Sequence, residues 1–366
     1  MQLNTQMATN HKTFINCSNL LLSSMSRPAV SSLVLLLVFM VSCLLVIAPA
    51  KNFIMLKETR EGDQQHPTYT APIDGSTRGQ PFYSINMSDV EILLPSPIKL
   101  RRKDLKDFVV VSAVSANYFK RLTKLVASVQ RYFPKNKVII YDLGLTDKEH
   151  AQARRLCQVE VKKFPFHKYP AHVRELHSYA FKPLAVAETF MDPSVKGVFW
   201  ADGSIRFKTS NMSLLNEKSM KSDGMAVFTG TEHSVFSVTM PEMFDYLPMV
   251  RDSKMYECLI ATTVLMYRTE KVVRDILKWW VVCALSKECI WNRAYSGCPF
   301  AANGRNRWTE FGYCSRYDQS ALSILLYNAY LDYDDFLTYR IWGPGAFGDF
   351  LDITRWDWTN KLKLCR

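Results

Sequence analysis

Residues 196–207, KGVFWADGSIRF, decide the fold class of this chain. Residues 198–201 are an apolar run typical of a strand buried on both faces, and the run stops at Asp202-Gly203-Ser204. A carboxylate is therefore predicted at the carboxyl end of a buried strand, where open α/β sheets bind ligands. Asp202 can equally turn the chain by bonding its own backbone, with Gly203 allowing a positive φ, so this stretch alone leaves both interpretations open.

Strands and helices alternate before this stretch. β-Branched and apolar runs predict strands at residues 108–114, 138–143, 159–164 and 197–201. Apolar spacing predicts helices at residues 118–132, 146–156 and 183–190. Thr146 and Glu149 have the spacing of a capping box, which supports the start of the second helix. Alternation of this kind predicts βαβ units and a mostly parallel sheet flanked by helices, so the fold class is α/β.

The pattern changes after residue 207. Short strands are predicted at residues 224–229, 234–239 and 262–267, and long helices at residues 270–285 and 319–330. Asp318 opens the last of these helices.

The amino-terminal part carries an apolar segment. Residues 30–48 hold 19 residues without a charge, close to the roughly 20 that a helix needs to cross a bilayer. We expect a transmembrane signal anchor at 30–50, a cytosolic tail at 1–29, a stem rich in Pro, Ser and Gln at 51–106, and a folded lumenal domain at 107–366. A cleaved signal peptide is the alternative, because Ala48-Pro49-Ala50 resembles a cleavage site.

Sequons and cysteines favour the secretory lumen for the large carboxyl-terminal part. Asn86 and Asn211 each begin an N-x-S sequon. Seven of the nine cysteines follow the apolar segment, and the four within 283–314 predict a local disulfide framework. The odd number leaves one thiol free or paired between chains, so a homodimer is conceivable. The predicted location is a Golgi or other secretory-pathway membrane, with type II topology.

The charge balance narrows the class of partner. The chain has 46 Lys and Arg residues against 34 Asp and Glu, a net charge of +12. These basic residues are spread along the chain without a nucleic-acid-binding signature, so we expect no nucleic acid partner. The charge indicates affinity for anionic ligands, such as phosphorylated substrates, or for a membrane face.

Several motifs resemble those of Golgi-type glycosyltransferases with the GT-A fold. FWADGSIRF stands where that superfamily has its D-x-D motif, ATTVLMYR is similar to a later acceptor-side strand, and YDQSALSILL is similar to a helix start with Asp and Gln. More closely, VVVSAVSANYF, VIIYDLGL, HSYAFKPLAVAE and ILKWWVVCAL resemble an animal membrane-protein family, numerous in invertebrates, that is classed as a domain of unknown function. The resemblance covers roughly residues 108–350.

The GT-A resemblance implies a nucleotide-sugar donor, a UDP sugar by analogy. The loop residues Ser115, Asn117 and Tyr118 would face the base and ribose. Asp202, with Ser204, would approach the diphosphate through Mn²⁺ or Mg²⁺, which neutralises the charge that develops on the leaving group. Ser204 stands where the D-x-D motif has its second Asp, so one carboxylate is present where two are usual.

Three further residues are candidates. Lys182 could place a positive charge at the phosphates, or it could be an ordinary surface lysine at a helix start. Asp318 and Gln319 could bind sugar or acceptor hydroxyls, with Asp318 the base of an inverting reaction. Asp318 could equally cap its helix.

The sequence thus predicts a glycosyltransferase that uses a nucleotide sugar and a glycan or glycoprotein acceptor. The first alternative is a GT-A-like membrane protein that binds a glycan or protein without catalysis, which the single carboxylate in D-G-S favours. The second alternative is a secreted or cell-surface structural protein.

Overall fold

The computed structural model describes residues 85–228, 231–249, 252–292, 297–300, 303–330, 332, 335–337, 347–354 and 362–365. The chain divides into two units, and every described residue belongs to the second, Thr68–Arg366. The expected tail, anchor and stem residues 51–84 lie outside the described part. Within the described part, no helix has the length and apolarity that crossing a membrane requires.

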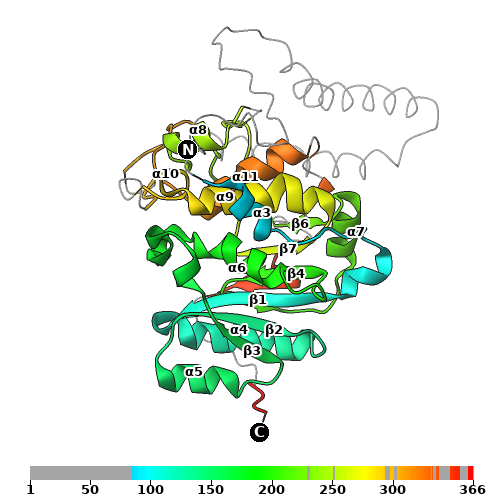
Figure 1. Cartoon of the computed structure of the whole chain (residues 1–366). Coiled ribbons are helices and arrows are strands. Elements are labelled where there is room, and N and C mark those ends of the chain that lie inside the picture. Colours follow the sequence, from blue (N-terminus) through cyan, green and yellow to red (C-terminus); the bar gives the residue numbers. More distant parts are fainter. Residues whose placement is uncertain are drawn as a thin grey trace, which may run out of the picture. The chain divides into compact units, whose positions relative to one another are not determined.

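A six-stranded sheet forms the centre of the second unit (Figure 1), and its strand order is β3-β2-β1-β4-β7-β6. The strands are β1 Phe108–Ser115, β2 Val138–Gly144, β3 Val159–Lys163, β4 Gly197–Ala201, β6 Met225–Val227 and β7 Thr263–Tyr267. Strands β3, β2, β1 and β4 are parallel to their neighbours, whereas β7 is antiparallel to both β4 and β6. All strands except β7 therefore point the same way, and the predicted mostly parallel α/β sheet is confirmed.

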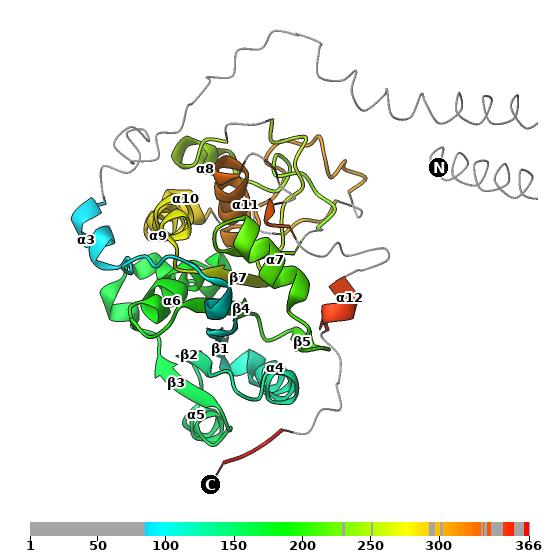
Figure 2. The same ribbon diagram turned by 90° about the vertical axis from the view of Figure 1, so that its right-hand side faces the viewer.

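Helices cover both faces of the sheet (Figure 2). Helices α4 (Phe119–Tyr132) and α7 (Ser213–Lys221) lie on one face, and α6 (Phe181–Phe190) and α9 (Lys278–Leu285) lie on the other. Side chains alternate along each strand, so one strand supplies both cores. In β4, Phe199 and Ala201 pack on the α4 side, while Val198 and Trp200 pack on the α6 side.

The remaining elements are short or lie around this sandwich. The helices are α3 Met87–Ile92, α5 Asp147–Arg154, α8 Pro241–Tyr246, α10 Lys287–Ile290, α11 Asp318–Ala329 and α12 Phe347–Phe350. The 3₁₀ turns are η2 Arg102–Lys106, η3 Ala116–Tyr118, η4 Phe166–Lys168, η5 Ala171–Arg174 and η6 Leu176–Ser178, and η7 Val272–Leu277 is a π-helix that leads into α9. Strands β5 (Ile205–Phe207) and β8 (Leu351–Ile353) pair antiparallel in a second, two-stranded sheet.

Most predicted elements are confirmed within one to three residues. The capping box is present at α5, where Thr146 accepts a hydrogen bond from the Glu149 N–H and the Glu149 carboxylate accepts one from the Thr146 N–H. The long helix predicted at 270–285 is present as η7 followed by α9.

The strand predicted at residues 234–239 is wrong. These residues form turns, with one isolated bridge from Ser234 to Glu257. The Ser234 hydroxyl accepts a hydrogen bond from the Ser237 N–H at 3.1 Å and lies 2.9 Å from the Ser237 hydroxyl. Serine side chains that bond the nearby backbone offer an alternative to a strand ladder, and a period-two pattern does not reveal this competition.

The folded unit begins before residue 107, which is the start of the folded domain that the sequence predicts. Val90, Leu100 and Leu105 are buried in the two cores. The Asp104 carboxylate accepts a hydrogen bond from Lys196 at 2.9 Å, and this contact, with help from Arg101, lowers the pKa of Asp104 to about 2. Residues 85–106 therefore belong to the domain and not to a stem, because their few apolar side chains fill the edge of each core.

Three disulfides tie the unit together. Cys283 pairs with Cys289 and Cys298 with Cys314, which confirms the predicted local framework, and a third bond joins Cys157 to Cys365. Cys258 is the free thiol among these seven cysteines, and it is fully buried. Because its sulfur is buried, Cys258 cannot pair with a second chain in this structure, and the homodimer stays a prediction.

Candidate functional site

The sheet has one topological switch point, between β1 and β4. The chain builds the sheet in one direction from β1 through β2 to β3, and β4 then adds to the opposite side of β1. In open α/β sheets, ligands bind in the crevice at the carboxyl ends of the strands that flank such a point. Strand β1 ends at Ser115, and residues 116–118 follow it as η3. The turn after β4 holds residues 202–204, so both predicted loops lie at this crevice.

Asp202, Lys182 and Asp318 meet at the α6 side of the crevice, although they come from the end of β4, the first turn of α6 and the start of α11. The Lys182 ammonium lies 2.7 Å from Asp318 Oδ2 and 3.6 Å from Asp202 Oδ1. It also donates a hydrogen bond to the carbonyl of Ala261 at 2.9 Å. The structure thus brings together three predicted site residues that are 136 positions apart at the extremes.

Burial sets the charge state of this cluster. The side chains of Lys182 and Asp318 are 3% and 4% exposed, whereas that of Asp202 is 28% exposed. Burial raises the pKa of Asp318 to about 6, against the opposing effect of Lys182. Burial also raises the pKa of Asp202. Burial alone would lower the pKa of Lys182, but the two carboxylates outweigh it and the pKa is raised. Lys182 therefore stays charged, and Asp202 is the carboxylate that faces the crevice.

Trp200 fixes the orientation of Asp202. The indole Nε1–H of Trp200 donates to Asp202 Oδ1 at 2.7 Å, and the Asp202 N–H donates to the carbonyl of Thr262 at 2.8 Å. Residues two apart on a strand share a face, so the spacing of Trp200 and Asp202 in the sequence indicated that their side chains lie close together. The sequence interpretation missed it by treating Trp200 only as part of an apolar run. Gly203 has no positive φ, so that part of the turn interpretation is wrong.

Two tyrosines extend the site toward solvent. Tyr179 and Tyr118 are 41% and 51% exposed, and the Lys182 ammonium lies 5.5 Å from the centre of the Tyr179 ring. Tyr179 has φ 55°, a left-handed conformation that bulky residues rarely adopt outside functional sites. The sequence offered Tyr118 through the resemblance but gave no signal for Tyr179, because a positive φ at a tyrosine has no local pattern.

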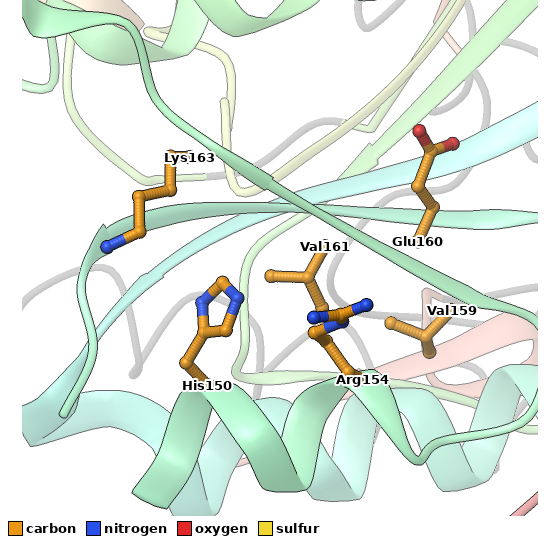
Figure 3. Close-up of a pocket in the computed structure, with 6 residues that line it drawn as sticks. All are labelled: His150, Arg154, Val159, Glu160, Val161 and Lys163. Carbon is orange, nitrogen blue, oxygen red and sulfur yellow. The ribbon is translucent and has the colours of Figure 1, made fainter. Parts of the chain in front are cut away.

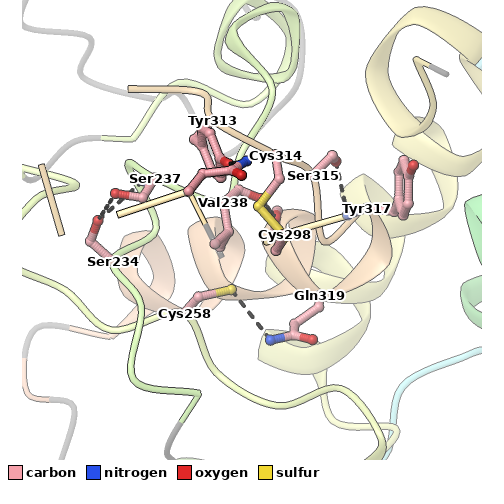
Figure 4. Close-up of a disulfide and its surroundings, with 12 residues drawn as sticks. Ser234, Ser237, Val238, Cys258, Cys298, Tyr313, Cys314, Ser315, Tyr317 and Gln319 are labelled. Atoms are coloured by element: carbon pink, nitrogen blue, oxygen red, sulfur yellow. Dashed lines mark hydrogen bonds between the residues drawn. A yellow bond between two sulfur atoms is a disulfide. The ribbon is translucent and has the colours of Figure 1, made fainter. Parts of the chain in front are cut away.

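The other predicted residues are placed differently. Ser115 ends β1 opposite Gly144, and Asn117 is exposed in η3. The backbone carbonyl of Ser204 accepts a hydrogen bond from the Thr354 N–H at 2.9 Å. Gln319 does not join the carboxylate cluster, because its amide is directed at the sulfur of Cys258, 3.5 Å away (Figure 4).

The residues at Asp202 do not form a divalent metal site. Asp202 Oδ1 is already bonded to Trp200, and the carboxylate of Asp318 is paired with Lys182. Throughout the described part of the chain, no group of three His, Cys, Asp or Glu side chains is arranged to hold a metal ion. The two carboxylates fit the Lys182 ammonium and not Mn²⁺ or Mg²⁺.

A separate hollow of about 480 Å³ lies between α5 and β3 (Figure 3). It is lined by His150, Arg154, Val159, Glu160, Val161 and Lys163. The neighbouring carboxylate of Asp142 accepts hydrogen bonds from the N–H groups of Gly144 and Leu145 and lies 2.8 Å from His150 Nδ1. These contacts fix the turn after β2, and none of the predicted site residues lines the hollow.

Residues 62–187 match the family described as "Protein of unknown function (DUF1647)". This match confirms the resemblance to a domain of unknown function over those residues. It spans β1, β2, β3 and most of α6, so it includes Lys182 and ends before Asp202. No curated protein matches the sequence.

Among solved structures, the galactosyltransferase LgtC in complex with donor and acceptor sugar analogues is similar over 60% of this chain and 70% of its own, with 14% identity and a TM-score of 0.33. An active-site mutant of LgtC has the same coverage and identity, with a TM-score of 0.34. The bifunctional glycosyltransferase WbbM in its apo form is similar over 51% of this chain and 38% of its own, with 11% identity and a TM-score of 0.35.

Proposed function

We propose that this chain binds a nucleotide sugar at the crevice between β1 and β4 and transfers its sugar to a glycan or glycoprotein acceptor. The observation that carries the proposal is the meeting of Asp202, Lys182 and Asp318 at the switch point of the sheet. A cation and two carboxylates held in fixed positions beside exposed aromatic rings suit a ligand with an anionic part and a ring.

In this proposal each residue has a separate role. Ser115, Asn117, Tyr118 and Tyr179 would contact the base and ribose, because Asn117 and the two tyrosines are exposed at the crevice and Ser115 is half-buried beside Asn117. Asp202 would bind sugar hydroxyls, since its carboxylate is the most exposed of the cluster. Lys182 would hold the carboxylates of Asp202 and Asp318 in place and would supply positive charge beside the sugar.

Transfer also needs a proton acceptor. As the acceptor oxygen bonds to the anomeric carbon, the bond from that carbon to the diphosphate breaks and the hydroxyl proton must leave. Asp318 remains the predicted base, with a pKa of about 6 that suits proton transfer near neutral pH. Because the Asp318 side chain is only 4% exposed, the Lys182 side chain would have to move before Asp318 could accept the proton.

The cellular setting is part of the same proposal. The apolar residues 30–50 would anchor the protein with type II topology in a Golgi or other secretory-pathway membrane. The sequon residues Asn86 and Asn211 are both exposed, which suits glycosylation in the lumen. The three disulfides suit an oxidising compartment.

A second candidate is a membrane protein that binds a glycan or protein without catalysis. The burial of Asp318 under Lys182 favours it, because a paired and covered carboxylate has no direct path to an acceptor hydroxyl.

Calorimetric titration tests the proposal. The full-length chain in non-ionic detergent is titrated with UDP, GDP and CMP, and then with the nucleotide sugar of the class that binds. The same titrations are made on Asp202→Asn. We expect one nucleotide to bind and Asp202→Asn to weaken the binding of the corresponding nucleotide sugar. Asp192→Asn is the control, because Asp192 precedes β4 and so lies at the opposite end of that strand.

Release of the nucleotide separates the two candidates. The nucleotide sugar of the class that binds is incubated with the chain and a mixture of deglycosylated glycoproteins. Acceptor-dependent release of the nucleotide supports transfer, whereas binding without release supports the second candidate. Failure of every nucleotide to bind a folded protein contradicts the proposed function.

A further inference from the structure

Positive charge without a matching carboxylate gathers on the α4 side of the 202–204 turn. Arg206, in β5, is 1% exposed, and its Nη1 donates to the carbonyls of Gly203 and Ile205 at 2.6 and 2.7 Å. Its buried Nε has no hydrogen-bond partner within the described part of the chain. No carboxylate of the described residues forms an ion pair with Arg206. A buried cation that lacks a counter-ion is costly.

The first turn of α4 adds to this charge. Gly203 lies against it, since a Cβ on Gly203 would be 3.5 Å from the Cβ of Arg121. Arg121 stacks over the Tyr118 ring at 5.1 Å and makes no ion pair with any described residue. Helix α4 has no side-chain cap and no acidic residue in its first turn, so its amino-terminal N–H groups and dipole also present positive charge here.

The nearby carboxylates of Asp352 and Asp202 contact other groups and not Arg206. Asp352 faces Arg206 across the β5 and β8 pair, but its carboxylate pairs with Lys208 at 3.7 Å. Asp202 points to the other face of the sheet, at Trp200 and Lys182. Burial and the like charge of Arg121 lower the pKa of Arg206 to about 10, and no acid opposes them. At neutral pH the guanidinium therefore remains charged and uncompensated.

We infer that Arg121, Arg206 and the first turn of α4 form an oxyanion site, which holds the diphosphate of the donor. This inference rests on the proposed function for the identity of the ligand. Arg121 binds the oxyanion directly, because its guanidinium is partly exposed and its planar fork suits two phosphate oxygens. Arg206 lies behind the 202–204 turn, where it positions the Gly203 carbonyl and adds the charge that the ligand neutralises.

The site lies on the opposite side of Asp202 from Lys182. A diphosphate at α4 would leave the attached sugar beside Asp202, at the centre of the crevice. Positive charge from two arginines would then take the place that a divalent metal has in a site with two carboxylates.

Titration with pyrophosphate tests the inference without a nucleotide. The full-length chain in non-ionic detergent is titrated with pyrophosphate, inorganic phosphate, UDP, GDP and the two nucleosides. We expect pyrophosphate to bind, and its affinity to fall about tenfold or more in Arg121→Gln and in Arg206→Met. Arg121→Gln removes a charge-assisted hydrogen bond, and Arg206→Met removes a positive charge near the ligand. Nucleoside affinity should fall much less than pyrophosphate affinity in Arg121→Gln, because a nucleoside lacks the phosphates that Arg121 binds.

Arg131→Gln is the matched control. Arg131 lies in the last turn of the same helix and stacks over Tyr132 at 5.3 Å, so the substitution removes the same charge and the same type of ring contact. Its pyrophosphate affinity should equal that of the unmodified chain. If Arg206→Met does not fold, as judged by its melting midpoint, Arg121→Gln alone decides.

Several outcomes overturn the inference. Absence of pyrophosphate binding overturns it. A loss of pyrophosphate affinity in Arg131→Gln equal to that in Arg121→Gln also overturns it. Phosphate that binds as tightly as pyrophosphate contradicts a diphosphate site. Nucleoside binding without pyrophosphate binding leaves the proposed function standing and removes the inference. Pyrophosphate binding without any nucleotide binding contradicts the proposed function and the donor as ligand, and leaves only an oxyanion site.

Discussion

At the scale of single residues, Lys182 is the centre of the candidate site. Its ammonium is within 3.6 Å of two carboxylates and is almost fully buried. Removing one partner of a buried ion pair leaves an uncompensated charge, which is more damaging than never having had the pair. The stability of the unit therefore depends on this lysine whether or not the protein is an enzyme.

Lys182→Met should lower the free energy of unfolding by about 3–5 kcal/mol at pH 7.5. The loss should be smaller at pH 5, because the pKa of Asp318 is raised to about 6 in the folded state against 3.8 ordinarily, so the folded protein takes up a proton first as pH falls. Urea unfolding at both pH values measures this. Lys168→Met, which breaks an exposed pair with Glu188, should change stability by less than about 1 kcal/mol. An equal loss at both pH values would contradict the assignment of Asp318.

Tyr179 separates binding from stability. Its left-handed backbone costs about 1–3 kcal/mol, which glycine would not incur. Tyr179→Gly should therefore leave the melting midpoint unchanged or raised, while nucleotide affinity falls about tenfold through loss of ring stacking. Thermal denaturation and calorimetry on the same preparation provide both readouts. A lower midpoint with unchanged affinity would mean that the ring only packs the domain.

At the scale of elements, the pairing of β4 with β7 holds Asp202 in place. Gly197 lies opposite Tyr267, and a Cβ on Gly197 would be 2.6 Å from the Tyr267 ring. The ring cannot move aside freely, because its hydroxyl donates to the carbonyl of Leu105. The start of β4 thus admits only glycine, and this contact also joins residues 85–106 to the sheet.

Gly197→Ala should destabilise the unit by about 1–3 kcal/mol through overpacking. Gly203→Ala, at the other end of the same strand, is the control for stability. Its Cβ would be 3.4 Å from the nearest atom and its φ is not positive, so its melting midpoint should change little. Thermal denaturation of the two variants, compared with the unmodified chain, measures the difference. Similar midpoints for both would show that Tyr267 moves more freely than this contact implies.

At the scale of the whole unit, the disulfide from Cys157 to Cys365 closes a separation of 208 residues. It fixes the end of the chain beside α5 and β3, where the Gln130 side chain also bonds the backbone of Lys363. Long loops lose the most conformational entropy on closure.

Cys157→Ser with Cys365→Ser should lower the free energy of unfolding by about 2–4 kcal/mol. Denaturant unfolding in the absence of a reducing agent measures this. Cys283→Ser with Cys289→Ser removes a disulfide that closes a separation of only 6 residues, so the loss of free energy of unfolding should be smaller. If the short loop costs more, the stabilisation comes from local packing and not from chain entropy.

The same physical reasoning separates what sequence could predict from what it could not. The pattern of apolar residues predicted β1, β2, β3, β4 and β7. In a buried sheet, the side chains along a strand either alternate between apolar and polar or are apolar throughout. Capping chemistry identified the start of α5. The strand predicted at 234–239 failed because serine side chains bonded the backbone locally, which no periodicity reports.

The sequence by itself determined the α/β class, the acid at the end of β4, the local disulfide framework and the individual candidates Lys182, Asp202 and Asp318. Only the tertiary structure decided that these three meet, that Gln319 turns to Cys258, and that Arg206 is buried without an ion pair to any described carboxylate. The reason is that local pattern fixes a residue's element and face, whereas distances between ends of separate elements depend on how the sheet and its helices pack.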